Sequence, residues 1–156
     1  MKKYIFLFLL YCVFFSPDYS FPQLTKAIIG VDGFTCSLCA KGVEEQFKTL
    51  DFVKSVKADI KKTEFTISFK TKPAINVKEL NSAVTDGGFT IRDIKVKAIG
   101  IIKGNSVSGY WLSASNIPDL KLKDLKGNFS EGDKISLEGA VDPVDVSLYV
   151  ISIKKL

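Results

Sequence analysis

The stretch from residue 33 to residue 39 reads GFTCSLC and places Cys36 and Cys39 three positions apart. It follows a short apolar run, residues 27–31, that is typical of a strand, and it precedes a segment with helical periodicity. Two thiols at the start of a helix can point to one spot. Unpaired backbone N–H groups and the positive end of the helix dipole favour the thiolate form there, which is the form that binds metal or attacks a disulfide.

The periodicity after this loop predicts a helix and then two strands. Val43, Phe47 and Leu50 fall at i, i+4 and i+7, which is one face of a helix. Residues 52–59 and 64–69 are typical of strands, and the turn between them is rich in lysine.

A second helix and a fourth strand complete this half of the chain. Asn76 and Glu79 form a capping-box pattern at the start of the helix, and Gly87-Gly88 ends it. Residues 89–96 then form the fourth strand. The order β-α-β-β-α-β predicts a ferredoxin-like α+β domain over residues 24–97.

The segment from residue 98 to residue 156 contains short strands and turns. Its β-rich runs are residues 99–102, 110–114, 134–141 and 144–153. Residues 120–122 form a fifth strand, unless Pro118 opens a short helix through Leu125. Five short strands predict a small closed all-β barrel, similar to an oligonucleotide/oligosaccharide-binding (OB) barrel, because closure removes exposed strand edges.

Residues 1–20 have the pattern of a secretory signal peptide. Lys2 and Lys3 precede an apolar run from Tyr4 to Phe15, shorter than the roughly 20 residues that span a bilayer. An uncleaved N-terminal anchor is the alternative, and Cys12 is interpreted as an apolar leader residue rather than a lipid-attachment site. Both alternatives predict an exported protein, periplasmic or otherwise extracytoplasmic, in an oxidising compartment. Membrane contact is expected only if the leader is not cleaved.

Composition excludes several classes of site. The chain has 156 residues, a net charge of +5, three Cys, one Met and no His. Without histidine there is no His-based catalytic triad, His-ligated zinc site or imidazole proton shuttle. The single Met is the initiator. Soft-metal or thiol chemistry therefore depends on cysteine alone.

The cysteine loop resembles the heavy-metal-associated domain family, found in copper chaperones, metal-transporting ATPases and periplasmic mercury-binding proteins. The motif of that family is G-M-T-C-x-x-C. Gly33, Thr35, Cys36 and Cys39 stand in its places, whereas Phe34 replaces the usual Met. The resemblance covers about residues 26–97 and implies a metal site at the two cysteines.

Two aromatic residues acquire expected roles from this resemblance. Phe34 is expected to anchor the loop against the core by burial, as the family's Met does. Gly88-Phe89 resembles the family's Gly-aromatic pair in the loop that faces the metal. Phe89 is therefore expected either to shield the site or to act as a core residue at the start of its strand.

The family implies Cu(I) or another soft ion, held by Cys36 and Cys39. The donor set agrees, since thiolates select Cu(I), zinc and similarly soft ions. Structural zinc takes four protein ligands, and zinc-selective members often carry Asp where this chain has Thr35. Asp32 is interpreted as a turn residue. We therefore expect Cu(I) first, Hg(II) second, and Zn(II) or Cd(II) after them.

Two other interpretations of the cysteine pair remain open. After export, Cys36 and Cys39 can form a plain disulfide in an adaptor whose barrel binds a protein or a glycan. They can also form a thiol–disulfide exchange centre, although the chain lacks the thioredoxin strand order. No catalytic constellation is visible, so an enzyme is not expected. The expected function is buffering or transfer of a soft metal ion.

Charge indicates which partners the chain meets. The last 60 residues carry 8 basic and 7 acidic side chains, too even a balance for a nucleic-acid-binding barrel. A metal-transporting membrane protein or another metallochaperone is the expected partner. Excess lysines in the first domain can guide it toward an acidic partner, although most are interpreted as solvated surface. They include Lys41, Lys54, Lys57, Lys61 and Lys62.

Overall fold

The computed structural model describes residues 21–33 and 36–156. The predicted leader, residues 1–20, and the loop residues Phe34 and Thr35 lie outside the described residues. Among the helices of the described ranges, none is long and apolar enough to cross a membrane.

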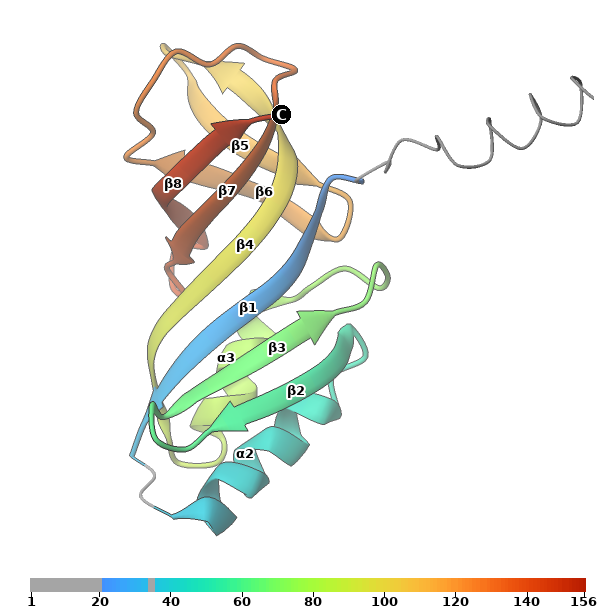
Figure 1. Cartoon of the computed structure of the whole chain (residues 1–156), viewed down its shortest axis with the longest axis vertical. Helices are drawn as coiled ribbons and strands as arrows, with labels where there is room; N and C mark the ends of the chain where they lie inside the picture. Colours follow the sequence, from blue (N-terminus) through green and yellow to red (C-terminus); the bar gives the residue numbers. More distant parts are fainter. Residues whose placement is uncertain (1–20, 34–35) are drawn as a thin grey trace, which may run out of the picture.

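The first half of the chain has the predicted β-α-β-β-α-β order. Its elements are β1 (Gln23–Asp32), α2 (Ser37–Lys48), β2 (Val53–Asp59), β3 (Glu64–Phe69), α3 (Val77–Thr85) and β4 (Thr90–Asn105). The four strands form an antiparallel sheet in the order β2-β3-β1-β4. Behind this sheet lies α3, and α2 packs beside it (Figure 1). The ferredoxin-like fold is confirmed.

Apolar side chains from α2 fill the space against the sheet. Val43 and Phe47 are buried, as the helical spacing predicts, and Ala40 is buried with them. The Phe47 ring meets Phe65 of β3 edge to face, with ring centroids 5.5 Å apart. Leu50 was expected on this helix face but follows the helix end and is only partly buried. The core therefore fixes the position of α2, whose first turn carries the cysteines.

The long strand β4 belongs to both halves of the molecule. It runs without interruption from the sheet beside β1 into the upper part of the structure (Figure 1). The separate strands predicted at residues 89–96 and 99–102 are thus one strand. Burial alternates through Ile94, Val96, Ala98, Gly100 and Ile102, so the period-2 pattern continues across the expected boundary and no turn interrupts it.

The second half is a ring of five strands. The added strands are β5 (Gly109–Ala114), β6 (Ile117–Lys123), β7 (Lys134–Val141) and β8 (Ser147–Lys155). The order β4-β5-β6-β8-β7 is closed by pairing of β7 with β4. All these neighbours are antiparallel except β6 and β8, which are parallel.

The local structure of this segment tests two expectations, the kind of element at residues 120–122 and the start of the last strand. Residues 120–122 lie in β6, where Leu120 and Leu122 are buried and Lys121 is exposed; the alternative helix from Pro118 does not form. The last strand was expected from residue 144 but starts at Ser147. A turn precedes it, because Asp142 Oδ1 accepts a hydrogen bond from the Val144 N–H at 2.8 Å.

The buried side chain of Asn116 joins the two halves. Its Oδ1 accepts a hydrogen bond from the Leu24 N–H at 2.8 Å. Its Nδ2 donates to the carbonyl oxygens of Leu24 at 2.8 Å and Lys70 at 3.3 Å. The Asn116 carbonyl also accepts from the Ile75 N–H at 2.7 Å. One residue of the β5–β6 turn therefore holds β1 and the segment that precedes α3.

Acid is expected to weaken the ring through Asp145. Its carboxylate accepts hydrogen bonds from Lys123 Nζ and Ser147 Oγ, both at 2.6 Å, and these lower the pKa of Asp145 to about 2. A carboxyl whose pKa is lower in the folded state stabilises the fold above its ordinary pKa of 3.8. That stabilisation is lost as the pH falls toward 2.

We therefore expect D145N to have a lower Tm than the unmodified protein near neutral pH. This Tm difference should shrink as the pH falls from 3.8 toward 2. Circular dichroism melting across the acid range measures this. Asp51, whose carboxylate makes no hydrogen bond or ion pair to another described residue, supplies the control D51N. A pH-independent Tm difference for D145N would contradict the assignment.

Candidate metal centre

The cysteine loop leaves the sheet at the end of β1. Ile29 and Val31 are fully buried in that strand, which fixes the strand end. Gly33 follows with φ of +101°, a conformation that residues with a Cβ rarely adopt. The chain can therefore turn from the strand toward α2 within a few residues, and glycine is required at this position.

Cys36 is the N-cap residue of α2. Its backbone is extended, with φ −126° and ψ 150°, and its Sγ accepts a hydrogen bond from the Cys39 N–H at 3.1 Å. No acidic residue lies in the first turn of the helix. The position of Cys36 at the start of the helix is as the sequence predicted, and the positive end of the helix dipole favours a thiolate there once the disulfide is reduced.

Cys36 and Cys39 are joined by a disulfide, and their Cα atoms lie 5.4 Å apart. Cys36 is exposed, whereas Cys39 is half-buried and packs against the core. Between them Leu38 leaves 78% of its surface exposed. The two sulfur atoms therefore lie together at the surface, beside an apolar side chain that the core does not use.

Phe89 lies next to the start of this loop. A Cβ atom on Gly33 would lie 3.5 Å from Cδ1 of Phe89, and the ring also covers Gly87. Phe89 is half-buried and packs against the core. Both roles expected from the sequence, covering the loop and packing in the core, are compatible with this position.

Arg92 binds the end of β1, just before the cysteine loop, and the sequence did not predict this role. Its Nη1 donates to Asp32 Oδ1 at 3.0 Å and to Thr63 Oγ1 at 2.9 Å. Its Nε donates to Asp93 Oδ2 at 3.0 Å. Asp32 is thus tied to the β2–β3 turn and to β4. The partners of Arg92 at Asp32 and Thr63 are distant in sequence, so no local motif reveals them.

Removing the Arg92 side chain is expected to loosen the end of β1. The Val31 N–H donates to the Thr63 carbonyl at 2.9 Å, and Arg92 holds the side chain of Thr63. We expect R92A to speed amide hydrogen exchange at Val31, while exchange at Phe65 in the middle of the sheet stays unchanged. K62A, in the same turn, is the control. Unchanged exchange at Val31 in R92A would show that the network does not hold the strand end.

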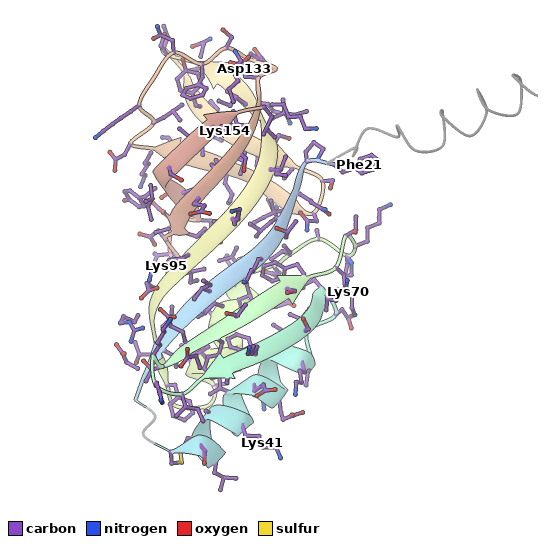
Figure 2. All side chains as sticks on the ribbon, in the orientation of Figure 1. Phe21, Lys41, Lys70, Lys95, Asp133 and Lys154 are labelled. Carbon is purple, nitrogen blue, oxygen red and sulfur yellow. A yellow bond between two sulfur atoms is a disulfide. The ribbon has the colours of Figure 1, made fainter. Side chains whose placement is uncertain are left out.

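No third metal ligand accompanies the cysteines in the described ranges. Across residues 21–33 and 36–156, no group of three or more Cys, Asp or Glu side chains could hold a metal ion. The nearby carboxylate of Asp32 is bound to Arg92 instead. Figure 2 shows Lys41 pointing from α2 into solvent. The described residues therefore offer the two cysteines as the only soft ligands of this site.

The geometry defines a class of protein. A ferredoxin-like domain with two cysteines at the start of its first helix can present two thiolates to one soft ion once the disulfide is reduced. The family comparison agrees, because residues 28–90 match the model of the "Heavy-metal-associated domain" family. Over these residues the chain is similar to heavy-metal-associated domains.

Three solved structures are similar to part of the chain. The "CopZ metallochaperone" is 21% identical, covers 43% of this chain and 98% of its own, and has a TM-score of 0.40. The N-terminal domain of PacS from Synechocystis PCC6803 is 21% identical over 43% of this chain and 92% of its own, with a TM-score of 0.37. The yeast copper transporter domain Ccc2a, solved in apo and Cu(I)-loaded states, is 19% identical over 46% and 93%, with a TM-score of 0.39. No curated protein matches the chain.

Proposed function

We propose that the chain binds one soft metal ion through the Sγ atoms of Cys36 and Cys39 and buffers it or passes it to a partner. The observation that carries this proposal is the cysteine pair at the N-terminus of α2, within a segment that is similar to heavy-metal-associated domains. A dithiol reductant supplies two electrons and two protons to open the disulfide. The thiols then lose their protons as they bind the ion.

Cu(I) is the preferred ion, with Hg(II) second. Both are satisfied by two thiolates, whereas structural zinc takes four ligands. The described part of the chain offers no third donor beside the cysteines. Zn(II) and Cd(II) are therefore expected to bind more weakly than Cu(I).

Exposure of the pair suits transfer by ligand exchange. Cys36 is open to solvent, so a thiolate of a partner can attack the bound ion before Cys39 releases it. The exposed Leu38 offers apolar contact area beside the sulfur atoms. A metal-transporting membrane protein or another metallochaperone is the proposed partner.

The remaining parts of the proposal concern the compartment and the ring. Residues 1–20 direct export, to the periplasm or another extracytoplasmic space. The ring of β4 to β8 is an OB-like barrel, supported by its closure through β4 and β7 and by the parallel pairing of β6 with β8. It binds no nucleic acid, and the chain is not an enzyme.

A competition titration tests metal binding. The protein is reduced without oxygen and titrated with Cu(I) in the presence of bicinchoninate, a coloured Cu(I) chelator. We expect one Cu(I) per chain to leave the chelator, and we expect binding to weaken as the pH falls, because protons compete for the sulfur atoms. Failure of the reduced protein to remove Cu(I) from the chelator would overturn the proposal.

The redox alternative predicts a different result. A thiol–disulfide exchange protein would accelerate reduction of insulin by a dithiol, and its Cys36 thiolate would form mixed disulfides with substrate. A plain structural disulfide would do neither and would bind no Cu(I). Running the insulin assay beside the Cu(I) titration separates these functions.

A further inference from the structure

A cleft separates α3 from the ring, and nothing in the proposed metal function uses it. It is open to solvent and has a volume of about 730 Å³, within the roughly 300–1,000 Å³ typical of small-molecule sites. One wall is the segment before α3 together with the first turn of that helix, residues 74–79, and the other comprises Trp111 of β5, residues of β6 and the turn before β8. None of the described residues of the cysteine loop belongs to this lining.

Both walls of the cleft are held in place by hydrogen bonds. Asn76 caps α3 through its contact with the Lys78 N–H at 3.1 Å, and Ile75 is bonded to Asn116. On the other side Asp145 accepts from the Ser147 N–H at 3.0 Å. A preformed cleft loses little conformational freedom when it takes up a ligand.

The charges lining the cleft are unequally compensated. Asp119 is paired with Lys103 at 2.9 Å, and Asp145 is paired with Lys123. Lys78 and Lys121 also line the cleft, but neither ammonium group forms an ion pair with any described residue. Glu79, the third carboxylate of the lining, accepts a hydrogen bond from Asn76 Nδ2 at 2.8 Å but forms no ion pair with a described residue, so it offsets one of these charges. One net positive charge remains, which favours a ligand that carries negative charge.

The apolar and acidic groups of the lining further restrict the chemical class of the ligand. Trp111 is half-buried and presents an indole ring, on which a flat apolar face of a ligand can stack. The carboxylates of Asp119, Asp145 and Glu79 can only accept hydrogen bonds. Each already accepts a hydrogen bond within the chain, but a ligand that shields their remaining lone pairs from water without donating removes the hydrogen bonds that water makes there, which costs affinity. The ligand must therefore bring hydroxyl donors as well as negative charge.

We propose that this cleft binds an acidic saccharide. The apolar face of a sugar ring stacks on Trp111, its carboxylate groups meet Lys78 and Lys121, and its hydroxyl groups donate to the acidic side chains of the lining. Neutral saccharides lack the charge, and aromatic carboxylates lack the hydroxyl donors.

The single tryptophan makes the test direct. Trp111 is the one Trp in the sequence, so selectively excited indole emission reports on this cleft alone. The full chain is titrated with trigalacturonate while Trp emission and heat of binding are recorded. We expect saturable binding that weakens as salt is added, and about tenfold weaker binding of a neutral galactose trisaccharide. Equal binding of the neutral sugar, or no saturable signal with trigalacturonate, would overturn the proposal.

Two double variants distinguish binding in the cleft from general electrostatic attraction to the positively charged protein. The double variant K78Q/K121Q removes both unpaired positive charges, and we expect it to bind trigalacturonate about tenfold more weakly. The matched control K54Q/K57Q removes two exposed lysines of β2 that form no ion pair with a described residue, and it should leave binding unchanged. An equal loss in both double variants would indicate non-specific attraction and overturn the site. Indole-3-acetate serves as the aromatic probe, and tighter binding of it than of trigalacturonate would overturn the saccharide assignment.

Discussion

Replacing Cys36 and Cys39 by serine is expected to abolish high-affinity Cu(I) binding. The binding free energy of a structural zinc site is roughly 10–16 kcal/mol, shared among four ligands. If each thiolate contributes a similar share to Cu(I) binding, losing one thiolate weakens binding by about 100-fold. C36S and C39S should each show a loss of this size, and the double variant should lose at least about a thousandfold. Competition with bicinchoninate under reducing, oxygen-free conditions measures all three.

The matched control for this experiment is S37A. Ser37 is exposed between the two cysteines and offers no soft ligand, so its substitution should leave Cu(I) affinity unchanged. Removing the disulfide also removes a covalent link from the oxidised protein. Folding is therefore compared by circular dichroism with the disulfide reduced in every sample. Cu(I) affinity of the double variant equal to that of the unmodified protein would place the metal elsewhere.

The second large effect is expected at Asn116. Its side chain is 1% exposed and satisfies both the N–H and the carbonyl of Leu24. Leucine at this position fills a similar volume but makes none of these hydrogen bonds. Buried polar groups left without partners cost about 1–3 kcal/mol each, so N116L should lower the free energy of unfolding by about 3–4 kcal/mol. Urea unfolding, followed by circular dichroism, measures the change.

Asn105 provides the comparison for that measurement. Its side chain also bonds to backbone, accepting from the Val107 and Ser108 N–H groups at 2.9 Å, but it lies at the exposed end of β4, just before the turn to β5. Water can replace these bonds, so N105A should cost at most about 1 kcal/mol. Similar losses in N116L and N105A would show that burial at the junction does not matter. A single unfolding transition is expected in both, because β4 runs through both halves.

The sequence predicted the ferredoxin-like half well because its signals are local. The spacing of Val43 and Phe47 gives the buried face of α2, and the capping pattern at Asn76 and Glu79 gives the start of α3. The Asn76 side chain does accept from the Lys78 N–H, and it donates to Glu79 at 2.8 Å. Each of these signals comes from residues within about one or two helical turns of one another, so it can be recognised in a single sequence.

Boundaries in the second half were predicted less accurately. The junction at Lys97 and Ala98 was expected to separate two strands, yet β4 continues because Ala98 is buried in register with its neighbours. The start of β8 was placed too early, since the turn at Asp142 depends on a side chain bonding to its own backbone region. Strand ends are set by pairing with distant strands, which alternating hydrophobicity alone does not specify.

By itself the sequence determined the pair of cysteines, their position at a helix start and the lack of any histidine ligand. These follow from residue identity and spacing, which no folding step can alter. The tertiary structure decided which groups surround them and what else the chain offers. Arg92 reaches Asp32 across 60 positions of sequence, and Asn116 reaches Leu24 across 92. The cleft between α3 and the ring likewise exists only because strand pairing through β4 holds the two halves together, and such long-range contacts depend on packing that one sequence does not display.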